Sequence, residues 1–275
     1  NIVGNETCIL IIDETQEYWY YTMISNKGII LERQKITQDK ILSVDTLLAS
    51  IQKEQIPQKM KSDLLPKIIY SSLYKKIMYI PDGIYHRFPL SALLEKEKKD
   101  DIKHLPNIRL YKKFSEQVKS NKGSAFFAFS DPETIKATYR TRLAELPGTY
   151  KEVKRLSNQY PNVTTYSGKN ATKANFINAY QDTNIQYIHL ALHGLANSGE
   201  KDDVKLFFRT STGGLDSLYG YELLKYKSKC QKIVLSACQS GIGTYEKGEG
   251  LFSLPRYFMI NGATDVAFNY WDVED

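Results

Sequence analysis

Two short apolar runs constrain this chain more than any other feature of its sequence. The first, Ile188–Leu192, is interrupted only by His189 and leads directly into His193 and Gly194. The second, Ile233–Ala237, is interrupted only by one serine and leads into Cys238. Continuous apolar runs of this length, bounded by turn residues, are typical of strands buried on both faces of a parallel sheet. The histidine and the cysteine then follow the carboxyl ends of two strands, where open α/β sheets place their active sites.

The second half of the chain alternates between strand-like and helix-like stretches. Strands are expected at 125–129, 162–166, 185–192, 204–208, 232–236 and 263–271, and helices at 145–160, 172–180, 219–226 and 249–260. This alternation predicts βαβ units and a mostly parallel sheet that helices cover on both faces.

The first half has a different pattern. Antiparallel strands are expected at 7–12, 17–25 and 29–31, helices at 39–52 and 62–74, and a strand at 76–80 that ends in the turn Pro81-Asp82-Gly83. A polar joint at 119–123 predicts a boundary between an N-terminal subdomain, 1–120, and a second subdomain, 121–275. Since the sequence stops directly after a predicted strand, we expect the second subdomain to be incomplete at its C-terminus.

An imidazole beside a thiol is the equipment of a cysteine peptidase. His193 would take the proton of the Cys238 thiol to supply the thiolate, and would later protonate the leaving amine. The backbone N–H groups of Gly194 and Cys238 are the candidate oxyanion hole. The two side chains are 45 residues apart, near the spacing of roughly 50 found in caspases.

Other interpretations of the same residues stay open. A cysteine at the end of an apolar strand is more often a packed hydrophobe than a nucleophile. The chain would then be a non-catalytic scaffold that binds a partner, or Cys238 would be a redox-sensing thiol without a nearby resolving cysteine. We interpret His189 as a core or supporting residue, and Cys8 and Cys230 as structural.

A substrate pocket for the P1 side chain, S1, is expected near Ser236 and the acidic end of the chain. Asp272 and Asp275 follow an aromatic strand end. They either line the S1 pocket and favour a basic side chain, or they are solvated acids at a frayed terminus.

Composition excludes several function classes. The net charge of +6 is spread over mixed runs with no dense basic stripe, so direct nucleic-acid binding is not expected. The three cysteines form no CxxC pair, and neither a metal nor a cofactor is predicted. No stretch approaches the roughly 20 apolar residues of a membrane span, and no signal peptide is recognisable, so a cytoplasmic location is expected.

Four stretches of the sequence resemble the CHAT family, the caspase-like peptidase domains associated with tetratricopeptide repeats, in the clan of caspases and separase. They are 79–83 with 88–93, then 146–148 with 152–153, then 189–194, and finally 235–238 through 248–251 and 261–263 to 271–275. Together they cover roughly residues 60–275.

The resemblance implies a caspase-hemoglobinase fold, a three-layer α/β/α sandwich preceded by a degenerate caspase-like N-terminal half. It matches His193 and Cys238 to the family dyad. It also implies a protein substrate and an activating protein or ribonucleoprotein partner, bound through an upstream repeat region. Such proteins act in bacterial defence, including CRISPR-associated systems, or in programmed cell death.

Overall fold

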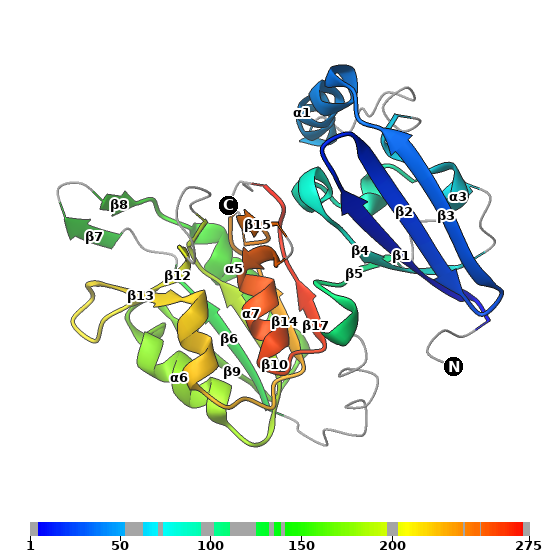
Figure 1. The fold of residues 1–275 in the computed structure, drawn as a ribbon. Coiled ribbons are helices and arrows are strands. Elements are labelled where there is room, and N and C mark those ends of the chain that lie inside the picture. The colour runs from blue at the N-terminus through cyan, green and yellow to red at the C-terminus, as the bar shows by residue number, and fades with distance from the viewer. Residues whose placement is uncertain are drawn as a thin grey trace. The chain divides into compact units, whose positions relative to one another are not determined.

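A computed structural model describes residues 5–52, 63–70, 74–94, 102–110, 125–131, 135–138, 141–196, 203–238, 240–247 and 249–271. The chain divides into two compact units, Asn1–Lys112 and Lys113–Asp275 (Figure 1). Each unit has its own five-stranded sheet and its own hydrophobic core.

The sheet of the first unit combines an antiparallel meander with two parallel strands. Its strands are β1 (Thr7–Glu14), β2 (Tyr18–Ser25), β3 (Gly28–Lys35), β4 (Lys76–Ile80) and β5 (Ile102–His104). Their order is β3-β2-β1-β4-β5. β1, β2 and β3 pair antiparallel, which confirms the predicted N-terminal strands, and β4 and β5 add in parallel.

Helices of the first unit follow the prediction only in part. The first lies where it was expected, as α1 (Gln38–Gln52). The helix predicted over 62–74 is interrupted at Leu65 and Pro66: residues 63–64 and α3 (Lys67–Tyr70) are helical, and residues 62 and 71–73 lie outside the described residues. Pro66 directly precedes α3, and a proline is tolerated at a helix start but not in its interior.

The predicted turn Pro81-Asp82-Gly83 leads into two short 3₁₀ helices, η1 (Gly83–Arg87) and η2 (Leu90–Ala92). Gly83 has φ +53°, and a β-carbon there would collide with the Glu14 carboxylate. The positive φ favours glycine at this position.

The sheet of the second unit is entirely parallel. Its strands are β6 (Ala125–Ser130), β9 (Val163–Ser167), β10 (Ile185–Ala191), β14 (Lys232–Leu235) and β17 (Asp265–Ala267). They lie in the order β17-β14-β10-β6-β9, and each neighbouring pair is parallel. This confirms the mostly parallel sheet that the alternating pattern predicted.

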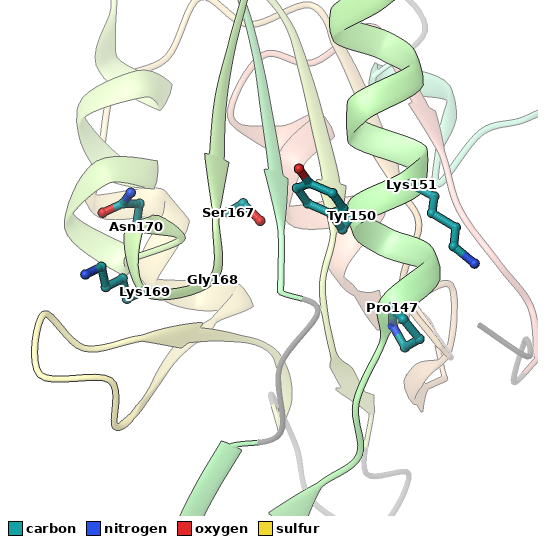
Figure 2. A pocket seen from close by; sticks show the side chains of 7 residues that line it. All are labelled: Pro147, Tyr150, Lys151, Ser167, Gly168, Lys169 and Asn170. Carbon is teal, nitrogen blue, oxygen red and sulfur yellow. The ribbon is translucent and has the colours of Figure 1, made fainter.

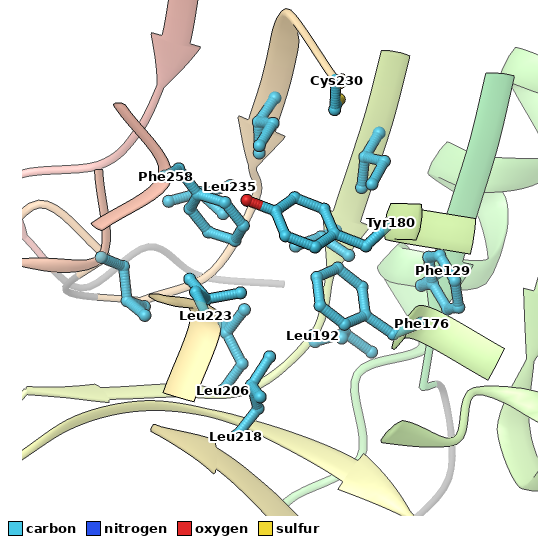
Figure 3. Packing of buried hydrophobic residues seen from close by; sticks show 14 of the residues in the cluster. Phe129, Phe176, Tyr180, Leu192, Leu206, Leu218, Leu223, Cys230, Leu235 and Phe258 are labelled. Carbon is cyan, nitrogen blue, oxygen red and sulfur yellow. The ribbon is translucent and has the colours of Figure 1, made fainter. Parts of the chain in front are cut away.

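Helices pack on both faces of this sheet. Among the described residues these helices are α5 (Pro147–Gln159), α6 (Lys173–Gln181) and α7 (Leu254–Ile260). Val153 of α5 packs against Ala128 and Ala191 on one face. On the other face, Phe176 of α6 and Phe258 of α7 belong to the main core around Leu190 and Leu235, part of which Figure 3 shows.

Smaller elements surround the parallel sheet. They are the antiparallel β11 (Gly194–Ala196), β12 (Val204–Arg209) and β13 (Leu215–Tyr219), the hairpins β7 (Ile135–Thr138) with β8 (Thr141–Leu143) and β15 (Gly243–Glu246) with β16 (Gly250–Ser253), and the 3₁₀ helices η4 (Gly168–Asn170) and η5 (Gly220–Lys225).

In the second unit, three predicted elements differ from the structure. The helix expected over 249–260 begins only at Leu254, because Gly250–Ser253 pairs with β15 and Pro255 lies in the first turn of α7. The strand expected over 263–271 is limited to β17, and the helix expected over 219–226 is of the 3₁₀ type. For the first of these, hairpin pairing with the neighbouring β15 overrode the local helical pattern.

Candidate active site

The strands that carry His193 and Cys238 are direct neighbours in the parallel sheet. Leu190 of β10 pairs with Leu235 of β14, and the Ser236 N–H donates to the Leu190 carbonyl at 2.9 Å. Both candidate residues follow this pair by three positions. Parallel pairing in this register brings the carboxyl ends of the two strands, and the residues after them, to the same edge of the sheet.

Residues that precede the candidate pair belong to the face of the sheet that α5 covers. Side chains alternate between the two faces along a strand. Leu190 and Leu235 point into the main core, while Ala191 packs against α5. His189 and Ser236 contact a side chain of α5, as described below, which places them on the same side.

The imidazole of His193 is held by a backbone carbonyl. Its Nε2 lies 2.9 Å from the oxygen of Ala144, in the segment that precedes α5. A carbonyl only accepts, so this contact assigns the proton to Nε2 and leaves Nδ1 as the acceptor in the neutral ring. In cysteine hydrolases a third group commonly orients the base in this way. The sequence showed no sign of this partner, because a backbone carbonyl has no residue-type signature.

Gly194 lies against the backbone of the cysteine loop. A β-carbon at this position would be 2.9 Å from the Cys238 carbonyl oxygen and 3.2 Å from the Ala237 β-carbon. The Phe207 N–H donates to the His193 carbonyl at 2.9 Å, so the next pair of that ladder, Gly194 with Leu206, is of the non-hydrogen-bonded kind. The Gly194 N–H therefore points away from β12.

Asn269, which follows β17, holds the loop on both sides of Cys238. Its side-chain amide donates to the Ala237 carbonyl at 3.2 Å. Its own N–H donates to the Ser240 hydroxyl at 3.1 Å, and its carbonyl accepts from the Gly241 N–H at 2.8 Å. A β-carbon at Gly241 would be 2.9 Å from this same carbonyl oxygen and would also collide with the Phe268 ring. Sequence reasoning missed Asn269 as a site residue.

A polar cluster made of Glu152, His189 and Ser236 lies beside the candidate pair. Glu152 Oε1 is 3.0 Å from His189 Nε2, and Glu152 Oε2 accepts from the Ser236 hydroxyl at 3.0 Å. The contact with His189 holds the pKa of Glu152 below its ordinary value. The interpretation of His189 as a supporting residue agrees with its 6% exposure. Glu152 was not singled out as a site residue, although it lies in one of the family-like stretches.

The structure describes some of the remaining predicted site residues and not others. Ser236 is half-buried, and Cys238 is half-buried as well. Asp272 and Asp275 lie outside the described residues, so their assignment to the S1 pocket stays a prediction. Cys8 and Cys230 are each 1% exposed and belong to the cores of the first and second unit.

A cavity of about 680 Å³ opens farther along the same edge of the sheet, between the start of α5 and the turn after β9 (Figure 2). Its lining consists of Pro147, Tyr150, Lys151, Ser167, Gly168, Lys169 and Asn170. Neither His193 nor Cys238 belongs to this lining. Among the described residues no cluster of His, Cys, Asp or Glu has the arrangement of a metal site. In the same part of the chain no helix has the length and apolar character needed to cross a membrane.

Comparison with known proteins assigns the chain to one family. The family model described as the CHAT domain matches residues 45–275. The comparison with curated proteins finds no match. One similar solved structure is a Bacteroides thetaiotaomicron protein described as having an actin-like ATPase fold and unknown function. The two chains are 12% identical, and the match covers 98% of this chain and 93% of that one. Its TM-score of 0.18 is too low to carry any argument about fold.

Proposed function

The chain belongs to the CHAT domain family, whose domain is related to caspase-like peptidases, and on that premise we propose that this protein is a cysteine endopeptidase. Cys238 is the nucleophile and His193 is the general base and acid. The observation that carries the proposal is the parallel pairing of Leu190 with Leu235. His193 and Cys238 each follow this pair by three residues, just beyond the ends of two adjacent strands, which supports their assignment as a catalytic pair.

The proposed reaction uses each group of the site in turn. His193 takes the thiol proton, and the thiolate attacks the scissile carbonyl to form a C–S bond. The N–H groups of Gly194 and Cys238 stabilise the resulting oxyanion. When the C–N bond breaks, His193 gives its proton to the leaving nitrogen and a thioester remains. Water, deprotonated by His193, attacks the thioester and releases the new carboxyl end and the thiol.

Other parts of the site support this chemistry by holding its members in place. The Ala144 carbonyl, bound to Nε2, leaves Nδ1 of His193 as the atom that exchanges protons with the thiol. The bonds from Asn269 restrain the loop on either side of Cys238. Such positioning matters because small displacements of a reacting group cost large factors in rate.

The wider biological setting is also part of the proposal. The second unit would have the caspase-hemoglobinase fold, and residues 1–120 a degenerate caspase-like one. A protein or ribonucleoprotein partner, bound through a repeat region, would activate cleavage of a specific protein in bacterial defence or programmed cell death. The resemblance of the four sequence stretches to the CHAT family supports this setting.

Covalent labelling of Cys238 tests the proposal. Wild type, Cys238→Ala and His193→Ala would be treated with peptidyl acyloxymethyl ketones that differ in their P1 residue, with and without candidate partners. Intact-mass analysis is expected to show one adduct on wild type, none on Cys238→Ala, and labelling at least about 100-fold slower on His193→Ala.

Cys230→Ala is the matched control, since its thiol is buried in the core and burial raises its pKa to about 12. This variant should still be labelled at Cys238. Failure of every P1 series to label wild type under any of these conditions would contradict the peptidase and favour a scaffold that binds a partner without catalysis.

A further inference from the structure

The Glu152 side chain contacts two neighbouring side chains and is also partly exposed to solvent. Its two oxygens contact His189 and Ser236, each at 3.0 Å. The His189 side chain is 7% exposed, whereas the Glu152 side chain is 40% exposed. These two contacts hold the carboxylate in position, while a substantial part of the Glu152 side chain stays accessible to another molecule.

The position of Ser236 places this carboxylate near the nucleophile. Ser236 precedes Cys238 by two residues and still bonds to β10 through its N–H. Two residues span at most about 7 Å. A lysine or arginine side chain, with its flexible stem, is long enough to reach from the scissile carbonyl to a carboxylate at that depth.

Charge and hydrogen-bonding capacity also suit a cation. Contact with His189 and the Ser236 hydroxyl lowers the pKa of Glu152, so the group is ionised at neutral pH. An ionised carboxylate offers about four acceptor sites over its two oxygens. The Ser236 hydroxyl occupies one direction on Oε2, and His189 Nε2 lies 3.0 Å from Oε1, which leaves acceptor capacity for a bidentate guanidinium or an ammonium group.

We propose that Glu152, held by His189 and Ser236, forms the anionic floor of the S1 pocket and selects substrates with lysine or arginine at P1. The inference rests on the proposed peptidase function and adds the class of side chain that it recognises. It does not depend on Asp272 or Asp275.

A comparison of basic and neutral probes tests the selection. The protein would be labelled with acyloxymethyl ketones that carry arginine, lysine, citrulline or norleucine at P1 and are otherwise identical. The second-order labelling rate at Cys238 should be about 10- to 100-fold higher for arginine than for citrulline, and for lysine than for norleucine. Higher ionic strength should reduce this ratio, because salt screens the attraction between partly exposed charges.

Glu152→Gln removes the charge and keeps the size of the side chain. This variant should lose most of the preference for basic probes while it is still labelled by the neutral ones. Glu17→Gln is the matched control, an exposed glutamate of the first unit, and should keep the wild-type ratio. If Glu152→Gln does not fold, the wild-type ratio and its salt dependence still test the inference.

The outcomes separate this inference from the peptidase proposal. Equal labelling by basic and neutral probes, or an unchanged preference in Glu152→Gln, would overturn the role of Glu152 while Cys238 remains a working nucleophile. Absence of any Cys238 adduct with every probe would overturn the peptidase proposal and the S1 assignment with it.

Discussion

At the scale of single residues, Asn269 makes three hydrogen bonds to the loop that carries Cys238. Replacing it with alanine removes the bond to the Ala237 carbonyl and leaves the two main-chain bonds in place. We expect Asn269→Ala to fold, with a loss of about 1 kcal/mol in the free energy of unfolding. Labelling of Cys238 should slow by roughly 10- to 100-fold, because the thiol is no longer held in position.

The control for this variant is Asn26→Ala, which removes a side-chain amide that donates to the exposed Asn5. It should change neither quantity noticeably. A labelling rate for Asn269→Ala equal to that of wild type would show that the main-chain bonds alone position the cysteine loop.

At the scale of elements, one buried ion pair joins β12 to the end of β6. Arg209 is 5% exposed and Asp131 is 1% exposed. The Arg209 guanidinium donates to both oxygens of Asp131, with distances of 2.8, 2.9 and 3.1 Å. Since β12 also pairs with the segment that follows His193, this pair connects the small antiparallel sheet beside the candidate site to the parallel sheet.

Removal of the carboxylate charge should destabilise the second unit. For Asp131→Asn we expect a loss of about 3–5 kcal/mol in the free energy of unfolding, because a buried guanidinium loses its counter-charge. The double variant Asp131→Leu with Arg209→Met should be clearly more stable than the single one. Urea unfolding curves measure both, and a single variant as stable as wild type would refute the role of the pair.

Elements also show where local patterns mislead. The predicted helix over 249–260 contains a strand, because Gly250–Ser253 finds a partner in β15. The strands β15 and β16 themselves were not predicted. Their short segments have little pattern of their own, and a hairpin is stabilised mainly by cross-strand pairs that no single segment reveals.

At the scale of the whole molecule, the two units have separate cores and each contains one of the two tryptophans. Trp19 is fully buried in the first unit, and Trp271 lies in the second. The fluorescence of a Trp271→Phe variant therefore reports on unfolding of the first unit alone. This separation makes the pH dependence of one core measurable.

The first unit should lose stability in mild acid through His104. Burial lowers the pKa of His104 to about 3, and His86, whose ring centre is 6.1 Å away, adds to the effect. Between this value and the ordinary 6.5, the unfolded chain binds a proton that the folded chain does not. Stability is thus complete above pH 6.5 and falls as the pH drops toward 3.

From pH 7.5 to pH 5, the expected loss in the free energy of unfolding is about 2 kcal/mol. Urea unfolding followed by Trp19 fluorescence measures it. The His104→Phe variant, which has no titrating group at this position, should show a smaller change over the same range. An equal pH dependence in both proteins would assign the effect to other groups.

The sequence by itself determined the parallel α/β pattern of the second unit and the two residues at its strand ends. Both follow from local properties, since apolar runs mark buried strands and residue types carry their own chemistry. The four family-like stretches determined the family. None of these conclusions required knowledge of which segments lie side by side.

The tertiary structure alone decided what surrounds those two residues. Ala144 is 49 positions from His193, Glu152 is 84 positions from Ser236, and Asn269 is 32 positions from Ala237. These contacts depend on the order of the strands and on which helix covers which face. Long-range packing sets both, and a backbone carbonyl or an ordinary asparagine leaves no periodic or compositional signal in the chain.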